Sequence, residues 1–223
     1  MFLAVGAILL LIGAGTVYFI INNRTSEKRS PAAVPPSQTK YYATAYVSME
    51  TDYGTIVMAL YGNATPITVQ HFLELVGADF YNGTIFHVVI KDQLIEGGGY
   101  LTNLSQKVIP VNGTTGQLAS IPLEINPVMK NTMGTVGMVH NATDPNTAVS
   151  EFYINLADNP SLDKNQTNPG FAVFGKVLSG MDVADSIGNI PVSDQATPGG
   201  ATLVNVPDEH IKIRDVVVLG SPG

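Results

Sequence analysis

The chain contains no cysteine, so histidine is left to supply any side-chain chemistry that these two residue types share, such as binding zinc or acting as a nucleophile. The absence of cysteine excludes a thiol nucleophile, a disulfide framework and cysteine-based zinc or iron–sulfur sites. The four histidines are His71, His87, His140 and His210, and no two of them have the i, i+4 spacing of a helical metal pair. His87 follows Phe86 inside an apolar run, where a buried structural histidine is favoured over a ligand or a base. The sequence therefore predicts no metal site.

Three further patterns match known sites only in part. Gly97–Gly99 could cradle a phosphate, but neither a helix nor the lysine of a nucleotide-binding loop follows it. Ser150 with His140 lacks the G-x-S-x-G turn of a hydrolase nucleophile. The remaining acidic candidates do not have the spacing of a twelve-residue calcium loop: Asp144, Asp158 and Asp163. No single motif predicts the chemistry, and no cofactor is expected.

The elements that would position these residues are mainly short strands. Helices are expected at 65–77, where Thr65 can cap and Pro66 suits the first turn, and at 180–187. Gly97–Gly99 should interrupt regular structure, and 100–122 should form a long surface loop. Strands are expected at 46–50, 55–61, 84–90, 134–140, 151–156, 171–177 and 211–219. This pattern predicts a mainly β fold, a closed or nearly closed barrel capped by helices.

The N-terminal part differs from the rest of the chain. Residues 1–21 carry no charged side chain, and a helix of this length spans roughly 30 Å, the thickness of a bilayer core. We expect one transmembrane anchor here, with a cleaved signal peptide as the alternative. Residues 22–41 are rich in Pro, Ser and charge and are expected to be a tether. The folded domain is expected at 42–219, with a short tail at 220–223.

The charge of the chain argues against a nucleic-acid partner. Of 11 Lys and Arg and 18 Asp and Glu in the chain, four basic residues and one acidic residue precede residue 41. The predicted domain therefore keeps 7 basic against 17 acidic residues. Phosphate contacts need a basic face, so no nucleic-acid binding is expected.

Two signals disagree about the side of the membrane on which the domain lies. The positive charges after residue 21 favour the cytoplasm. Glycosylation triplets of the form N-x-[ST] favour export, because chance predicts about two and seven occur. Turn chemistry is the alternative explanation of these triplets. We expect an extracytoplasmic, single-pass anchored domain with these candidate sites: Asn23, Asn63, Asn82, Asn103, Asn112, Asn141 and Asn165.

Several ordered blocks cover residues 45 to 219. The first half contains T-P-x-T-V-x-x-F-x-x-L from Thr65, F-Y-N-G-T-x-F-H-x-V-I from Phe80 and L-I-E-G-G-G from Leu94. The second half contains G-T-V-G-M, S-E-F-Y-I-N, F-A-V-F-G-K-V and G-M-D-V. In this order the blocks resemble the cyclophilin-type peptidyl-prolyl cis-trans isomerases. The resemblance implies an eight-stranded antiparallel barrel with two capping helices, and an enzyme that acts on X-Pro segments of unfolded or flexible polypeptides without a metal or cofactor.

The resemblance also shows where this chain departs from the family. The family has an Arg directly after the Phe-His pair, and that position is Val88 here. The glutamines of the Q-G-G and S-Q-F-F blocks are Glu96 and Glu151, and the pocket Phe before Q-G-G is Gln93. His140 aligns with a pocket position and is the candidate for a replacement donor.

An apolar recess of proline size is still implied by the remaining aligned positions. These are Leu94, Phe152, Tyr153, Leu162 and Phe171, with a place in the barrel core as the alternative, above all for Phe152. We therefore expect a membrane-anchored isomerase that assists folding of exported proteins, with activity weakened by the loss of the Arg. A non-catalytic prolyl-peptide binder is the alternative function, and a purely structural surface module is a third.

Overall fold

The computed structural model describes residues 41–111, 114–116 and 119–221. The expected anchor at 1–21 and nearly all of the expected tether lie outside these residues. Within the described part of the chain, no helix is long and apolar enough to cross a membrane.

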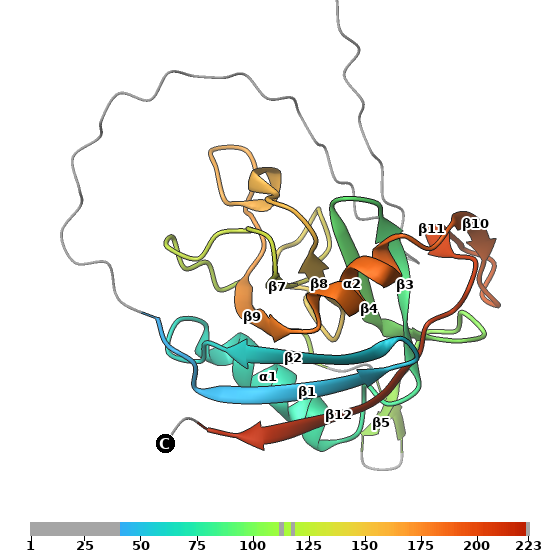
Figure 1. The fold of residues 1–223 in the computed structure, drawn as a ribbon, viewed down its shortest axis with the longest axis horizontal. Coiled ribbons are helices and arrows are strands. Elements are labelled where there is room, and N and C mark those ends of the chain that lie inside the picture. Colours follow the sequence, from blue (N-terminus) through green and yellow to red (C-terminus); the bar gives the residue numbers. More distant parts are fainter. Residues whose placement is uncertain (1–40, 112–113, 117–118, 222–223) are drawn as a thin grey trace, which may run out of the picture.

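One antiparallel sheet of eight strands forms the body of the domain (Figure 1). Its spatial order is β12-β1-β2-β9-β7-β8-β4-β3. The strands of this sheet are β1 (Ala45–Thr51), β2 (Gly54–Leu60), β3 (Thr84–Ile90), β4 (Leu94–Leu101), β7 (Thr135–Met138), β8 (Phe152–Asn155), β9 (Val173–Ser179) and β12 (Ile213–Gly220). All seven predicted strands are present, and the eighth is β4, which the sequence pattern did not identify.

The sheet curls into a half-barrel, which is more open than the closed or nearly closed barrel expected from the sequence. Its edge strands β12 and β3 meet only at an isolated bridge between Ile85 and Lys212. Two backbone bonds support this contact: Gly83 N–H donates to the Ile213 carbonyl at 2.7 Å, and Phe86 N–H donates to the Ile211 carbonyl at 3.1 Å. A bulge-like register shift between Phe86 and Val88 also interrupts the ladder between β3 and β4.

The run Gly97–Gly99 lies inside β4, so the predicted interruption is wrong. Glycine is needed there for space, because other parts of the chain press against the strand. A Cβ on Gly98 would lie 2.8 Å from the Tyr81 ring, and Gly98 has a φ of +89°. A Cβ on Gly99 would overlap the Glu151 side chain. The glycines thus allow close packing on β4 instead of ending it.

Two hairpins complete the strand inventory. The predicted loop at 100–122 contains β5 (Ile109–Val111) and β6 (Thr114–Gly116), which pair with each other. A second hairpin, β10 (Val192–Ala196) and β11 (Thr202–Pro207), follows the last helix and packs against β3. Its presence was not predicted, because Val192–Ala196 is almost entirely exposed and lacks an apolar alternation.

Two α-helices lie where the sequence predicted them: α1 (Pro66–Gly77) and α2 (Met181–Gly188). Helix α1 packs next to β12, whereas α2 lies against β2 and β4 (Figure 1). A short 3-10 helix, η1, covers Pro160–Leu162. Pro66 occupies the first turn of α1, but the Thr65 side chain makes no capping bond. Glu124 caps instead, accepting the N–H groups of Ile67 at 3.1 Å and Thr68 at 2.6 Å.

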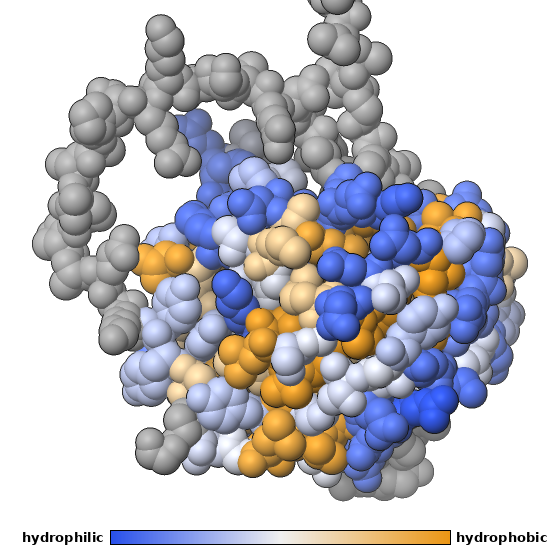
Figure 2. All heavy atoms as spheres, viewed as in Figure 1, coloured by the Kyte–Doolittle hydropathy of each residue, from blue (hydrophilic) through white to orange (hydrophobic). Residues whose placement is uncertain are grey.

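The apolar interior consists of two clusters. The main core fills the half-barrel between α1, α2 and the sheet, and it contains the aromatic group Phe72, Tyr81, Phe86, Phe152 and Phe174. The second cluster lies on β3 and β4 and is joined by Leu203 and Val206 of β11. Apolar side chains also reach the surface over β2, β1 and β12 (Figure 2), where Val217, Val218 and Leu219 of β12 are exposed.

Candidate active site

Most of the apolar residues implied by the resemblance meet in the second cluster. Val88 comes from β3, Leu94 from β4, Tyr153 from β8, Leu162 from η1 and Phe171 from the segment before β9. All five are buried, with exposed fractions between 0% and 7%. The fold therefore gathers residues that lie as far apart in the sequence as Val88 and Phe171 into one apolar cluster, which we call the wall.

Phe152 does not belong to this wall. Its ring packs edge-on against Phe72 at 5.9 Å, Tyr81 at 5.6 Å and Phe86 at 6.0 Å between centroids. Successive residues of a strand face opposite sides of the sheet, so Tyr153 and Phe152 point to different clusters. Phe152 therefore lies in the main core, the alternative expected for it, and not in the wall where a binding role would place it.

Tyr153 and Phe171 form the aromatic part of the wall. Their rings meet edge-on at 6.0 Å, and the Tyr153 hydroxyl donates to the Asn131 side chain at 2.6 Å. Asn131 is itself held by Asp163, whose carboxylate accepts the Asn131 backbone N–H at 2.9 Å and its amide at 3.0 Å. The hydroxyl of Tyr153 is thus fixed by a buried polar network, which positions the ring.

His140 stacks on Phe171 with ring centroids 4.3 Å apart and an interplanar angle of 15°. Its Nδ1 contacts the Asn141 carbonyl and its Nε2 contacts the Gly170 carbonyl, both at 2.8 Å. Both partners can only accept hydrogen bonds. In this conformation neither ring nitrogen is free to donate to a bound prolyl amide, which argues against the replacement donor predicted from the alignment.

No cation occupies the position that the family Arg would take. Val88 is fully buried and lies opposite Glu96 in the β3–β4 ladder. Arg214, the only arginine after residue 29, binds Asp52 through Nε at 2.7 Å and is mostly exposed. Gln93 sits in the turn before β4, where its carbonyl accepts from Leu156 N–H at 2.7 Å.

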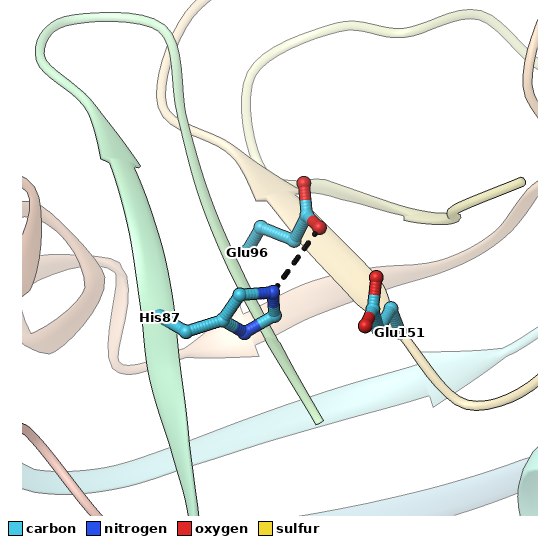
Figure 3. Close-up of side chains that lie close together, drawn as sticks. All are labelled: His87, Glu96 and Glu151. Atoms are coloured by element: carbon cyan, nitrogen blue, oxygen red, sulfur yellow. Dashed lines mark ion pairs between the residues drawn. The ribbon is translucent and has the colours of Figure 1, made fainter. Parts of the chain in front are cut away.

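A cluster of ionisable side chains that the sequence did not predict is shown in Figure 3, and it adjoins this wall because Glu96 is the cross-strand partner of Val88. His87 of β3, Glu96 of β4 and Glu151, which directly precedes β8, point toward one another. The His87 Nε2 atom lies 3.4 Å from Glu96 Oε1, and both side chains are fully buried. Glu151 is half-buried, and one ligand atom from each residue lies within 4.8 Å of the others.

Burial controls the protonation of the cluster. Desolvation raises the pKa of Glu96 to about 8 and, together with the Glu96 charge, raises the pKa of Glu151 to about 7. Desolvation also lowers the pKa of His87, against the opposing charge of Glu151. Near neutral pH the imidazole is therefore uncharged, and the two carboxyls share protons when no cation is present.

His87 was correctly predicted to be buried, but the cluster around it was missed. These residues match no metal motif in sequence spacing, because they come from β3, β4 and the residue before β8 and meet only in the folded sheet. The signal that could have found them is the simultaneous change of both family glutamines to glutamate at Glu96 and Glu151.

Five glycosylation candidates lie within the described residues, and Asn23 and Asn112 lie outside them. Asn103, Asn141 and Asn165 each accept hydrogen bonds from the backbone and hydroxyl of the Ser or Thr two residues later. This is turn chemistry. Asn82 is half-buried and donates to Asp215 at 3.0 Å, while Asn63 is exposed. Glycosylation stays a prediction.

Comparison with known proteins identifies the family. The family model described as cyclophilin type peptidyl-prolyl cis-trans isomerase/CLD matches residues 46–218. A peptidyl-prolyl cis-trans isomerase of Acinetobacter baylyi is 40% identical over 176 residues, which cover 79% of this chain and 86% of that protein. Peptidyl-prolyl cis-trans isomerase B of Escherichia coli is 34% identical and is covered to 98%, with 77% of this chain.

A solved structure gives the same result. The cyclophilin-type isomerase of Cryptosporidium parvum, determined in the presence of the dipeptide Ala-Pro, has 28% sequence identity and a TM-score of 0.62. The match covers 79% of this chain and 99% of that one. The half-barrel, the two helices and the sequence matches together show that this chain belongs to the cyclophilin-type peptidyl-prolyl cis-trans isomerase family.

Proposed function

We propose that the chain is a membrane-anchored isomerase of X-Pro bonds that assists the folding of exported proteins at a reduced catalytic rate. The family and its named relatives support the isomerase activity itself. Binding of Ala-Pro by this chain is inferred from the Cryptosporidium relative studied with that dipeptide. The reduced rate and the location are inferred from this chain alone.

The main support for a reduced catalytic rate is the buried valine at position 88. Rotation about a peptide bond has a barrier of about 18–20 kcal/mol, because amide resonance must be broken. An enzyme lowers this barrier by binding the twisted amide more tightly than the planar forms. Val88 offers no donor to the prolyl nitrogen, and Arg214 is held by Asp52. Loss of one such donor typically costs about 10²–10³ in rate.

The apolar wall supports the activity that remains. A proline ring requires an apolar surface, and four residues of the wall provide one: Leu94, Tyr153, Leu162 and Phe171. The hydrogen bond to Asn131 holds the Tyr153 ring in place. An apolar site that excludes water favours the less polar twisted amide even without a charged donor.

The test is exchange NMR of an Ala-Pro peptide with the purified full chain. We expect exchange above the uncatalysed rate but at least about 10²-fold below that of a relative that carries the Arg, assayed beside it. Tyr153→Leu, which removes the ring from the wall, should abolish the added exchange. The matched control Tyr53→Leu changes a tyrosine that is 39% exposed and should leave the rate unchanged.

Two other outcomes would contradict the proposal in different ways. Peptide-induced shifts of domain resonances without added exchange would show a non-catalytic prolyl-peptide binder, which the changes at Val88, Gln93 and Glu96 favour as the second function. Exchange as fast as that of the Arg-bearing relative would show that the valine does not weaken the activity. A dispersed amide spectrum for Tyr153→Leu confirms that the variant is folded.

The proposed location is the outer face of the membrane, with residues 1–21 as the anchor. The uncharged run supports the anchor, and the excess of N-x-[ST] triplets supports the outer face, with three of the seven triplets also explained by turns. Protease added to sealed membrane vesicles of known orientation should digest the domain when the outer face is exposed. Protection in these vesicles, with digestion in inverted ones, would place the domain in the cytoplasm.

A further inference from the structure

The cluster of His87, Glu96 and Glu151 has unsatisfied polar atoms at its centre. Neither ring nitrogen of fully buried His87 makes a well-aligned hydrogen bond among the described residues, and the nearest contact of Nε2 is the long one to Glu96 at 3.4 Å. When both carboxyls are ionised, the two oxygens of Glu96 also lack a donor. Buried polar groups are nearly always satisfied, so the His87 Nε2 atom and the Glu96 oxygens, which face the interior of the cluster, indicate a missing partner.

No side-chain cation supplies that partner. Across residues 41–111, 114–116 and 119–221, the ion pairs are His87 with Glu96, Lys130 with Asp163 and Arg214 with Asp52. Two carboxylates in one buried site without Lys or Arg carry a large desolvation cost unless a proton or a metal ion neutralises them. A proton satisfies one carboxyl at a time, whereas a divalent ion neutralises both and also binds the imidazole.

The chemistry of the three donors selects the kind of ion. Imidazole nitrogen suits zinc, copper, iron and nickel, whereas magnesium and calcium prefer sites made of oxygen alone. One His and two carboxylates form a set of three protein ligands, which in zinc proteins leaves one position for water or another ligand. With a neutral imidazole, two carboxylates balance the charge of a divalent ion.

We propose that His87, Glu96 and Glu151 bind one divalent transition-metal ion, with zinc as the fitting example. The proposal goes beyond peptidyl-prolyl isomerisation and differs from the expectation from the sequence that the chain has no metal site. The three donors come from β3, β4 and the residue before β8, which are neighbours in the sheet and hold the donors rigidly.

The surrounding structure gives the ion room and a path. A side chain at position 99 would overlap Glu151, so Gly99 is what lets this carboxylate lie over β4. Glu151 is half-buried, and it is therefore the ligand through which an ion would reach the buried His87 and Glu96. Ligand atoms within 4.8 Å of one another need only small side-chain rotations to reach zinc bond lengths of about 2.0–2.2 Å.

The site also lies beside the position where the family has its Arg. Val88 follows His87 in the chain and faces Glu96 across the ladder. A bound ion would place positive charge next to this position, which carries none in the protein alone.

The test is calorimetric titration of the full chain in mild detergent with zinc chloride, after removal of metal with a chelator. We expect one zinc ion per chain and a higher midpoint of thermal unfolding in its presence, because an ion that binds only the folded state stabilises it. His87→Gln, Glu96→Gln and Glu151→Gln should each weaken binding by at least about 10-fold, the usual minimum for disturbing a metal site. The control Glu50→Gln changes an exposed carboxylate and should leave the affinity unchanged.

The variants are chosen so that folding does not decide the result. Glutamine is the residue type that the family carries at positions 96 and 151, and Glu151→Gln changes only a half-buried side chain. Amide spectra of the variants without zinc report on the fold independently. Absence of saturable zinc binding, or binding by all three variants as tight as by the unsubstituted chain, would overturn the proposal. Isomerase activity is not the readout, so failure here is separate from failure of the proposed function.

Discussion

Replacing Phe72 with alanine is expected to lower the free energy of unfolding by about 3–5 kcal/mol. Phe72 is fully buried and lies on α1, where it contacts three other rings of the main core. Its centroid lies 4.9 Å from that of Tyr81, 5.2 Å from Phe174 and 5.9 Å from Phe152. Alanine would remove these contacts and leave a cavity that the rigid sheet cannot close.

Urea denaturation measures this loss, and the same helix supplies the control. Ile67 on α1 is 44% exposed, and Ile67→Ala should change the free energy of unfolding by no more than about 0.5 kcal/mol. The slope of the free energy against urea concentration should stay the same in both variants. A loss below about 1 kcal/mol for Phe72→Ala would show that this ring does not anchor α1 to the sheet.

Gly137→Ala is expected to destabilise the domain by about 3 kcal/mol, at the upper end for overpacking a core. Gly137 and Tyr153 are cross-strand partners in the β7–β8 ladder, and the Tyr153 ring lies directly over the glycine. A Cβ there would overlap the end of a ring that is fully buried and bonded to Asn131. The ring must therefore move, which also breaks the hydrogen bond.

A double-mutant cycle isolates this overlap. In a Tyr153→Ala background the ring is gone, so Gly137→Ala should then cost less than about 1 kcal/mol, and the difference is the interaction energy. Gly77→Ala is the glycine control, because a Cβ at Gly77 meets no atom within 4 Å. Equal costs of Gly137→Ala in both backgrounds would show that its effect does not come from Tyr153.

The elements that the sequence predicted well are those determined by local chemistry. Pro66 and the apolar spacing up to Gly77 placed α1, and the turn around Gly54 placed the first hairpin. The glycine run was misjudged because the reason for it is not local. Positions 98 and 99 require glycine because two residues distant in the sequence, Tyr81 and Glu151, occupy the space that a Cβ would need.

The same limit applies to the candidate site. The resemblance led to Val88, Leu94, Tyr153, Leu162 and Phe171, which the fold brings together. It favoured Tyr153 over Phe152, for which the barrel core was the main alternative, and the two residues do face opposite sides of β8. It also read Glu96 and Glu151 as two independent departures. Only the pairing of β4 with β3 and β8 shows that both carboxylates meet at His87.

The pairing of β1 with both β2 and β12 has a consequence for biosynthesis. Strand β1 leaves the ribosome early and pairs with β2 almost at once, but its other edge waits for β12, where Val47 pairs with Val218 (Figure 1). Until residues 213–220 are synthesised, the nascent chain carries an open strand edge, which is a template for aggregation. The sheet therefore completes only after residues 213–220 have been synthesised, so most of the domain is translated before β1 gains its second partner.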